Sequence, residues 1–443
     1  MTESIRRYVI VGSGVAAISA VEAIRHQDER GEIVVISDDP HGYYSRPGLA
    51  YYLTGEVEER LLFPFEETIF RRLNISQMQA HVHKIHTAEH EVQLANGARL
   101  PYDRLLVAVG AHAALPDVPG MQYQGVVKLD HLEDARQILK LARRARRAVV
   151  VGGGITALEI VEGLISRKVD VHYFLRSDRY WGNVLDETES ALIEHRLKEE
   201  GVQIHYHTEM DEVLGKNGWV TAVKTKDGRI INAEILAAAV GIKPRLDLVT
   251  RSGLKTSKGI QVDERMQSSA ADVFAAGDAA EVIDAAGKSV MNTLWWPARK
   301  QGRIAGTNMA GDCAVYTPSP AFNVTRLAGL TTTIIGNVGG GHDVDLTGIA
   351  RGDSETWRQL PDAIAAQKDF EVNRLRILVG TNTLVGAVVM GDQTLSQAIQ
   401  VLVTKKVDIT PIRDQLLNNQ DQLSDVLAAF WTDLREHDKS QVV

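Results

Sequence analysis

The stretch YVIVGSGVAAISAVEAIR, residues 8–25, joins a short apolar run to an amphipathic segment through a glycine turn. The run predicts a buried strand and the segment predicts a helix. Gly12 permits the tight turn, Gly14 lets the backbone approach a pyrophosphate, and Ala17 lets helix and strand pack closely. The phosphates would lie over the helix N-terminus, where N–H groups without partners and the helix dipole favour negative charge. The stretch therefore predicts a dinucleotide-binding unit.

An acidic residue follows at the distance that such a unit requires. The next apolar run, EIVVIS over residues 32–37, leads into Asp38 and Asp39. In a dinucleotide-binding unit, an acid about 20 residues beyond the glycines binds a ribose hydroxyl. We assign that role to Asp38. Strand, turn, helix, strand and acid in this order are far more specific than the glycines alone.

The same device recurs in RAVVVGGGITALEIVEGLISRKVDVHYFLR, residues 147–176. Again a predicted strand leads through Gly152, Gly153 and Gly154 into a predicted helix and a second strand. Two phosphate-binding units imply two dinucleotides. The alternative is that one unit is a structural relic, but both keep the small residues that close phosphate approach or tight packing requires.

The composition is that of an ordinary globular protein. The chain has 443 residues, 44% of them hydrophobic and 24% charged, so we expect two or three domains. A nucleic-acid partner is not expected, because the net charge is −8 and phosphate neutralisation needs a basic surface. The N-terminus runs straight into a strand, and no apolar run approaches the roughly 18 residues of a membrane helix. We therefore expect no transmembrane segment and a soluble, cytoplasmic protein.

Four further segments complete a known pattern. They are LPYDRLLVAVGAHAALPDVPG (100–120), ILAAAVGIKPRLDL (235–248), IQVDERMQSSAADVFAAGDAAEV (260–282) and NTLWWPARKQGRIAGTNMAG (292–311). Together with the two glycine units, they resemble the FAD-dependent pyridine nucleotide-disulfide oxidoreductase superfamily. The resemblance is closest to its rubredoxin and ferredoxin reductase and nitrite-reductase-like NAD(P)H branch, which lacks a redox-active cysteine.

The resemblance implies an α/β fold with two Rossmann-like dinucleotide-binding domains, for FAD and for NAD(P), and a C-terminal α+β interface domain. The expected boundaries are 1–116 and 246–320 for a discontinuous FAD domain, 117–245 for the NAD(P)H domain, 321–408 for the interface domain and 409–443 for a helical tail. The family's third domain often forms a dimer interface, so we expect a homodimer. We expect the amphipathic tail to pack on its own domain or a dimer mate, with peripheral membrane anchoring as the alternative.

The resemblance also implies the cofactor contacts. Those expected for FAD are Gly12, Gly14, Ala17, Asp38, Arg46, Pro47, the backbone of Val82, Ala108, Gly110, Asp278 on the ribityl chain, and Trp296. Those expected for NAD(P) are Gly152, Gly154, Ile155, Thr156, Glu159, Arg176 and Gly241. Pro297 suits the first turn of a helix, and the positive end of that helix would stabilise charge on the reduced flavin.

The stretch YYSRPGLAYYLTG, residues 43–55, bears on the electron acceptor. One branch of the family has a reactive cysteine in the column of Pro47, whereas carrier-protein reductases have a YxRPPLS segment that fits this stretch better. The chain's single cysteine, Cys313, lies beyond the last matched segment, and we expect it to be a small packed residue. A disulfide substrate needs a thiolate beside the flavin. We therefore expect hydride transfer to FAD without a catalytic cysteine, with Arg46 as electrostatic support and with Tyr44 and Tyr51 lining the pocket.

The expected nicotinamide is NADPH rather than NADH. The second unit ends with Arg176 where a short acid would stand, and a guanidinium there can pair with a 2′-phosphate. The alternative is a solvated surface arginine. The counterpart of Glu159 in ferredoxin-type reductases pairs with a lysine near flavin N5, but that column holds Tyr51 here. We therefore expect Glu159 to position the nicotinamide, or else to complement the helix dipole.

Four histidines lie close together in the sequence, namely His81, His83, His86 and His90. We expect solvated strand histidines here and no metal site. The residues that follow, EVQLANGARLPYDRLLVAVG, predict a hairpin with an Asn96–Gly97 turn.

Three functions stay open. The first is an FAD-dependent NAD(P)H oxidoreductase that delivers electrons to a small iron–sulfur or rubredoxin-like protein, or to oxygen or a quinone. The second is an NAD(P)H-responsive redox sensor that changes its interaction with a partner. The third and least favoured is an enzyme like coenzyme A disulfide reductase, which would need Cys313 to be brought in by dimerisation.

Overall fold

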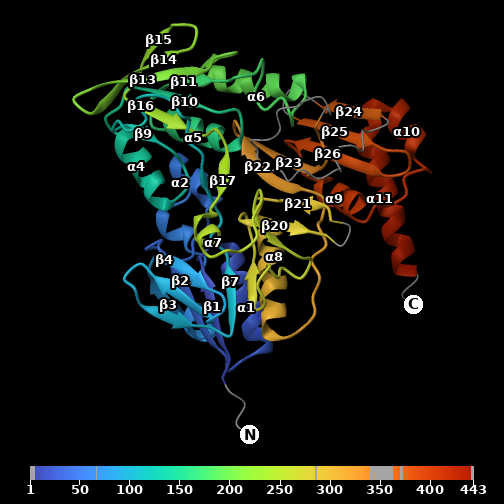
Figure 1. Ribbon diagram of the computed structural model, residues 1–443. Helices are drawn as coiled ribbons and strands as arrows, with labels where there is room; N and C mark the ends of the chain where they lie inside the picture. Colours follow the sequence, from blue (N-terminus) through green and yellow to red (C-terminus); the bar gives the residue numbers. More distant parts are fainter. Residues whose placement is uncertain (1–4, 66, 285–286, 340–362, 370–372, 441–443) are drawn as a thin grey trace.

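The computed structural model describes residues 5–65, 67–284, 287–339, 363–369 and 373–440. The fold class is α/β, as predicted, and its frame is a set of three five-stranded sheets within the described residues. Figure 1 shows the first sheet at one end of the molecule, the second at the other end and the third to one side.

The first sheet is parallel, with the strand order β19-β7-β1-β2-β3. Its strands are β1 (Arg7–Val11), β2 (Glu32–Ser37), β3 (Ile75–Gln79), β7 (Arg104–Val107) and β19 (Val273–Ala275). They are short apolar runs, as expected for strands that are covered on both faces. Strand β19 comes from far along the chain. Residues that precede the second sheet in the sequence and residues that follow it therefore share one hydrophobic core.

Two parallel helices, α1 (Val15–Gln27) and α8 (Trp295–Ala310), pack together on this sheet (Figure 1). A Cβ added at Gly302 would lie 2.1 Å from the carbonyl oxygen of Ala16, and one added at Gly306 would lie 2.4 Å from that of Ala20. The glycines therefore bring the two backbones into direct contact. Because the register is parallel, the positive N-terminal ends of both helices point the same way.

The second sheet is also parallel, with the order β12-β11-β10-β16-β9. Its strands are β9 (Val126–Val127), β10 (Arg147–Val151), β11 (Asp170–Phe174), β12 (Gln203–His205) and β16 (Ile235–Ala238). The helices of this unit are α4 (Leu132–Ala142), α5 (Ile155–Ile165) and α6 (Glu187–Glu199). An antiparallel meander of β13 (Met210–Lys216), β14 (Trp219–Thr225) and β15 (Ile230–Asn232) extends from it.

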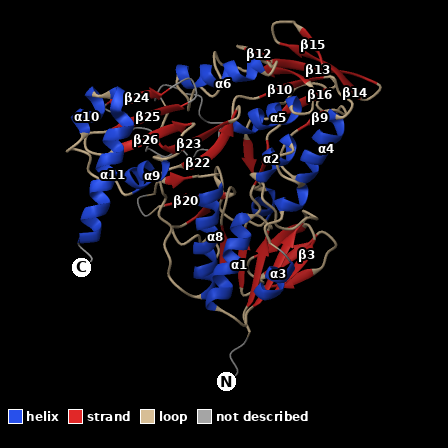
Figure 2. Ribbon diagram, turned by 180° about the vertical axis from the view of Figure 1, so that it is seen from behind, coloured by secondary structure: helices blue, strands red, loops and turns tan. Residues whose placement is uncertain are grey.

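The third sheet is antiparallel, with the order β22-β23-β26-β25-β24. Its strands are β22 (Phe322–Leu327), β23 (Leu330–Gly336), β24 (Ala363–Asp369), β25 (Asn373–Val379) and β26 (Leu384–Met390). The helices beside it are α9 (Ser396–Thr404), α10 (Arg413–Asn418), the short η4 (Gln420–Gln422) and α11 (Leu423–Ser440). Figure 2 shows α9, α10 and α11 gathered against the sheet. Leu416, Leu423 and Leu427 of the tail are buried in that core, and α10 ends at Asn418, so the tail is divided into two helices.

Short elements complete the fold. They are α2 (Gly48–Thr54), η1 (Glu59–Leu62), α3 (Glu67–Leu73), β4 (Val82–His86), β5 (Glu91–Leu94), β6 (Arg99–Pro101), β8 (Ala111–Ala113), β17 (Ile242–Pro244), α7 (Asp247–Arg251), β18 (Ile260–Val262), β20 (Ala280–Ile283) and β21 (Ser289–Val290). Strands β5 and β6 pair as a hairpin around Gly97, which confirms the predicted turn. Strands β8 and β17 pair antiparallel, so the two segments that cross between the first and second units run side by side.

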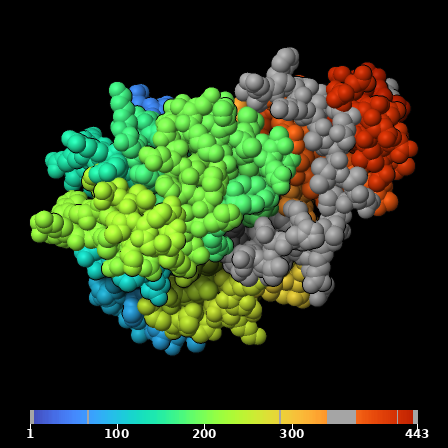
Figure 3. All heavy atoms as spheres, turned by 90° about the horizontal axis from the view of Figure 1, so that it is seen from above, coloured from blue at the N-terminus to red at the C-terminus, as the bar shows by residue number. Residues whose placement is uncertain are grey.

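The units touch through α2 and α5, where a Cβ added at Gly163 would lie 2.7 Å from the Cβ of Leu53. Seen from above, the C-terminal unit lies at one end of the molecule (Figure 3). Among the described residues, no helix is long and apolar enough to cross a membrane. The domain boundaries stay a prediction.

Candidate dinucleotide and flavin site

The first glycine turn has the shape that a pyrophosphate needs. Gly12 has φ +112°, and an added Cβ would lie 2.2 Å from the carbonyl oxygen of Ala108, so only glycine fits there. Helix α1 begins after Gly14, and a Cβ added at Gly14 would meet no atom within 4 Å. Ala17 is fully buried against the sheet. The N–H groups of the first turn therefore face open space, and FAD phosphates fit this cradle.

The two acids after β2 lie in different surroundings. The side chain of Asp38 is 70% exposed, and its carboxylate lies 3.4 Å from Nδ1 of His81, the residue directly before β4. Asp39 is buried, with its side chain 8% exposed. Asp38 is thus accessible to a ribose, as its assigned role requires, and that role stays a prediction. Sequence reasoning gave no role to Asp39.

A charged network joins Asp39 to the segments that cross into the second unit. Its carboxylate lies 3.7 Å from Nδ1 of His131, and Nη2 of Arg245 lies 3.0 Å from Nε2 of the same ring. The guanidinium of Arg245 also lies 3.3 Å from Asp130. Burial opposes ionisation of Asp39, but the nearby His131, the backbone N–H of His41, which donates to the carboxylate at 3.0 Å, and the charge of Arg46 lower its pKa to about 2. Asp39 is therefore a fixed negative charge at the junction of the units.

Asp278 lies between the first unit and the crossing segments. Burial raises the pKa of its carboxyl to about 6, against the field of Arg46, and Asp130 raises it further. The Asp278 side chain makes no hydrogen bond with any residue in the described part of the chain. A half-buried carboxyl without a partner fits a ligand that offers hydroxyl groups, as the ribityl chain of FAD does.

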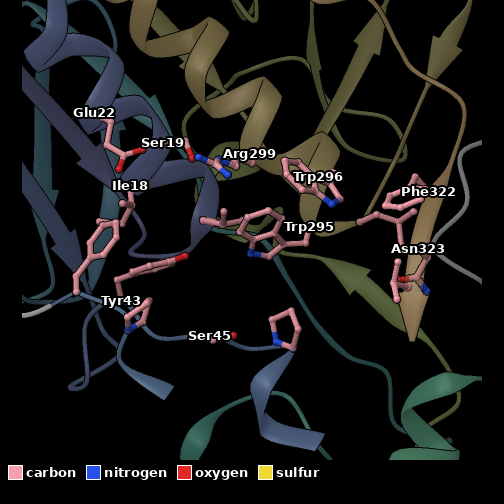
Figure 4. A pocket seen from close by; sticks show the side chains of 16 residues that line it. Ile18, Ser19, Glu22, Tyr43, Ser45, Trp295, Trp296, Arg299, Phe322 and Asn323 are labelled. Atoms are coloured by element: carbon pink, nitrogen blue, oxygen red, sulfur yellow. The ribbon is translucent and has the colours of Figure 1, made fainter. Parts of the chain in front are cut away.

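The N-terminus of α8 points toward the same region. Its first turn contains Pro297, as predicted, and has no acidic residue to neutralise the dipole. Trp295 points toward Tyr43 in Figure 4, whereas Trp296, predicted as an FAD contact, lies toward Phe322 and is 53% exposed. The role of Trp296 at the flavin stays a prediction.

The tyrosines of residues 43–55 separate into two groups. Tyr44 is buried: its hydroxyl donates to Asp39 at 3.2 Å and accepts from the N–H of Leu132 at 3.1 Å. Tyr43, which the sequence did not single out, lines a cavity together with Pro47. Tyr44 does not line that cavity and instead joins the first unit to the second. Its predicted place in the flavin pocket is not tested by these contacts.

The second glycine turn repeats the first. Gly152 has φ +144°, and an added Cβ would lie 2.2 Å from the carbonyl oxygen of Ala239. Gly154 precedes α5, and the space around it is open, so the N–H groups of Ile155 and Thr156 begin an accessible helix end. The positive φ values of Gly110, +68°, and Gly241, +116°, shape the loops after β7 and β16.

Arg176 follows β11 at the edge of this site. It is exposed and makes no ion pair or hydrogen bond with the described residues, whereas Arg179 binds Asp178 at 3.3 Å and the carbonyl oxygen of Gly182 at 3.2 Å. Arg176 is therefore available to a 2′-phosphate, and Arg179 is already engaged.

Glu159 lies on the face of α5 that looks toward the first unit. Burial, and then the neighbouring Glu162, raise the pKa of its carboxyl to about 7. Burial raises the pKa of Glu162 to about 7 as well, although the N–H of Gly329 donates to it at 3.1 Å. Glu159 is close enough to Tyr51 to raise the pKa of that phenol. Tyr51 therefore stands beside Glu159 at the position where the resemblance to ferredoxin-type reductases implies a lysine.

The burial of Glu159 predicts a pH-dependent stability. With a pKa of about 7 in the folded chain and 4.5 as its ordinary value, the native state holds a proton that the unfolded state loses between these values. The chain therefore loses stability as the pH rises from 4.5 to about 7, the loss is complete above pH 7, and it disappears as the pH falls back through this window. We expect Glu159→Gln to be more stable than wild type at pH 8, by at most about 3 kcal/mol, and equal to it near pH 4.5.

Urea unfolding of both proteins at pH 8, 6 and 5 measures this difference. The exposed Glu29→Gln is the matched control, and we expect its stability to follow that of wild type at every pH. If the free energy of unfolding of Glu159→Gln differed from that of wild type by the same amount at every pH, the prediction would be contradicted.

Cys313 lies far from these groups. It follows Gly311, the residue that ends α8, whereas the site residues lie at the other end of that helix. Cys313 is exposed, so the expectation of a packed residue was wrong. The chain leaves the helix through Gly311 in the left-handed conformation, and this turn carries the thiol to the surface.

The histidines of residues 81–90 do not gather around one point. His86 bonds to Gln93 at 3.0 Å, and the ring of His90 lies 5.4 Å from that of Tyr102. Among the described residues there is no group of three or more metal-binding side chains.

Comparisons with known proteins agree with this geometry. A family model described as pyridine nucleotide-disulphide oxidoreductase matches residues 6–302. Subunit epsilon of NADH-dependent phenylglyoxylate dehydrogenase from Aromatoleum evansii is 29% identical, covering 93% of this chain and 95% of its own. The ferredoxin–NAD(+) reductase component of the biphenyl dioxygenase system from Paraburkholderia xenovorans is 28% identical, covering 85% and 94%. The ferredoxin reductase for the CYP199A2 system from Rhodopseudomonas palustris has the same fold, with a TM-score of 0.83 at 21% identity over 95% of this chain and 100% of its own.

Proposed function

Because the chain belongs to the pyridine nucleotide-disulphide oxidoreductase family and is an FAD-dependent NAD(P)H oxidoreductase, we propose that it delivers electrons to a small iron–sulfur or rubredoxin-like protein. The observation that carries this proposal is the position of Cys313. Helix α8 has 16 residues, about 24 Å of rise, and Cys313 lies beyond its far end. Without a thiolate beside Pro47, a disulfide has no nucleophile to attack it.

The chain's own residues do the rest. When bound, FAD would supply the chemistry that links the two-electron donor NAD(P)H to an acceptor that takes one electron at a time. The glycine turns at Gly12 and Gly152 would hold the two pyrophosphates, and Asp278 would accept hydrogen bonds from ribityl hydroxyls. Arg46 and the positive end of α8 would stabilise negative charge at the flavin. Glu159 would position the nicotinamide.

The nicotinamide preference is the finer part of the proposal. The relatives described above carry NADH or NAD(+) in their names, which is a property of those proteins. Arg176 supports NADPH for this chain, because it is exposed and has no partner among the described residues. The homodimer and the cytoplasmic location stay predictions.

Replacing Arg176 should separate the two nicotinamides. We expect Arg176→Ala to weaken NADPH binding about 10- to 100-fold, the equivalent of a charge-assisted hydrogen bond, and to leave NADH within about 2-fold. Titrations of the purified protein with each nucleotide measure this, and the exposed Arg144→Ala serves as control. Equal effects on both nucleotides, or faster flavin reduction by NADH in wild type, would contradict the NADPH preference.

Anaerobic reduction followed by a panel of acceptors tests the function itself. The purified protein should be yellow, should bleach with NAD(P)H and should reduce a rubredoxin or a [2Fe–2S] ferredoxin faster than oxygen. Slow turnover with every acceptor and a nucleotide-dependent oligomeric state would favour the redox sensor. Loss of activity on alkylation of Cys313 would refute the mechanism without a cysteine.

A further inference from the structure

One edge of the second sheet carries an excess of positive charge. The strands of this sheet are parallel, so their N-terminal ends share one edge and their C-terminal ends share the other. The glycine turn at Gly152 follows the C-terminal end of β10. Strand β10 has 5 residues, so the edge at which it begins lies about 16 Å from that turn. The positively charged edge is therefore separate from the nicotinamide site.

The basic residues come from three segments. The link from α4 into β10, KLARRARR over residues 140–147, contributes most of them. The turn between α5 and β11 lies against this link, because the N–H of Asp170 donates to the carbonyl oxygen of Arg146 at 2.9 Å. The hairpin between β13 and β14 lies beside the start of β9, because the N–H of Gln124 donates to the carbonyl oxygen of Gly218 at 2.9 Å. We call the whole set the basic edge, and its members are Lys140, Arg143, Arg144, Arg146, Arg147, Lys168 and Lys216.

The cations of the basic edge are accessible. Arg147 is partly exposed and the other members are exposed, and none of their side chains makes an ion pair or hydrogen bond with the described residues. Asp170 lies opposite Arg147 in the register, and Glu234 accepts hydrogen bonds from the backbone N–H groups of residues 146 and 147 at 3.0 and 2.8 Å. Two more acids, residues 199–200, precede β12 at the end of the sheet. The positive excess is therefore concentrated around the start of β10.

Neither the composition nor the helix dipole accounts for this charge. The chain as a whole has a net charge of −8, so the basic edge is a local reversal of sign. Cations near the end of α4 complement the negative end of its dipole, but Arg144, Arg146 and Arg147 lie beyond the last turn. Most members are arginines, whose guanidinium groups bind phosphate through two hydrogen bonds. The basic edge therefore fits a partner that presents several phosphates.

An exposed tryptophan lies on the same edge. Trp219 is 48% exposed, forms a β-bridge with Gln124 just before β9, and stands opposite Lys216 in the β13–β14 hairpin. An indole has an apolar body and a polar N–H, a combination that suits the headgroup level of a lipid bilayer. Arginines for the phosphates and an indole for the headgroup region together favour a lipid surface over a soluble polyanion.

We propose that the basic edge binds the surface of an anionic lipid bilayer, with its arginines on the lipid phosphates and Trp219 among the headgroups. The proposal is independent of the electron acceptor. In this orientation the glycine turn at Gly152 lies on the side of the second sheet that faces away from the bilayer, so bound protein keeps its nicotinamide site accessible.

Co-sedimentation of the FAD-loaded full chain with vesicles tests this. We expect binding at low salt to vesicles of equal parts phosphatidylglycerol and phosphatidylcholine, release at about 0.5 M salt, and no binding to phosphatidylcholine alone. Each arginine should contribute about 5-fold, so the triple variant Arg143→Gln, Arg144→Gln and Arg146→Gln should bind about 100-fold more weakly. The fluorescence of Trp219, taken as the difference between wild type and Trp219→Phe, should shift to shorter wavelength when the mixed vesicles are added.

The matched control removes the same charge from the first unit, at the other end of the molecule (Figure 1). It is the triple variant Arg30→Gln, Arg72→Gln and Arg251→Gln, whose arginines are all exposed. We expect its vesicle binding to stay within about 2-fold of wild type, because its arginines lie far from the basic edge.

Three results would overturn the proposal: no binding of wild type to the mixed vesicles, equal losses in the two triple variants, or no shift in Trp219 fluorescence. Tighter binding to a single-stranded oligonucleotide or to polyglutamate than to the mixed vesicles, at the same salt, would overturn it in favour of a soluble polyanion. Circular dichroism and unchanged flavin reduction by NAD(P)H without vesicles show that a variant is folded. Arg144→Gln alone, with its expected loss of about 5-fold, decides the matter if the triple variant does not fold.

Discussion

Gly12→Ala is expected to lose FAD binding by at least about 100-fold. The added Cβ would lie 2.2 Å from the carbonyl oxygen of Ala108, and φ is +112°. That carbonyl cannot retreat, because it follows β7, which is hydrogen-bonded between β1 and β19. The methyl group must therefore displace the turn itself and, with it, the N–H groups that meet the pyrophosphate. Flavin absorbance of the purified protein and FAD titration measure the loss.

Gly153→Ala is the matched control for this change. An added Cβ there meets nothing within 4 Å, and the residue lies in the other phosphate turn. We expect it to keep a full complement of FAD. Circular dichroism shows whether Gly12→Ala is folded, and a folded Gly12→Ala that retains flavin would refute the assignment of this turn.

Arg376→Ala is expected to cost about 3 kcal/mol of stability, because it removes two hydrogen bonds from a buried carboxylate and leaves it Arg374, whose Nε lies 3.7 Å away, as its remaining cation. Arg376 of β25 binds Glu189 of α6 through two hydrogen bonds of 2.8 and 2.9 Å, and it also donates to the carbonyl oxygens of Val184 and Val338. Glu189 is 0% exposed and Arg376 is 4% exposed. The pair joins the second unit to the C-terminal sheet.

Chemical denaturation measures the effect, and Arg326→Ala is its control. Arg326 pairs with Glu56 at the surface, where such a pair contributes about 0–1 kcal/mol. Replacing both members, as Glu189→Met with Arg376→Met, should recover part of the loss because the buried carboxylate is removed together with the arginine that binds it. A loss below about 1 kcal/mol for Arg376→Ala would show that the carboxylate finds other partners.

The phosphate turns could be predicted from the sequence because their requirements are local. Gly12 and Gly152 stand where the backbone takes a positive φ and approaches a neighbouring carbonyl, and both needs follow from a strand–turn–helix pattern. The same holds for Pro297 in the first turn of α8 and for the Asn96–Gly97 hairpin. In each case a few consecutive residues determine the conformation.

The charged network of Asp39, His131 and Arg245 could not be predicted in this way. Its members are separated by 92 and 114 residues (131 − 39 and 245 − 131), and no local pattern connects them. Asp38 and Asp39 are adjacent acids, and only packing against the crossing segments buries one and leaves the other exposed. The exposure of Cys313 also depends on how the chain leaves α8.

The sequence by itself determined the two dinucleotide units, their cofactors and the absence of a cysteine from residues 43–55, because these depend on residue type and short-range spacing. Only the tertiary structure decided that Tyr43 rather than Tyr44 lines the cavity beside Pro47 and that Phe65 and Arg299 line the same cavity. It also decided that Glu189 and Arg376 form a buried pair across two units. These features arise where segments far apart in the chain are brought together, and the free energy that selects them is that of packing and desolvation.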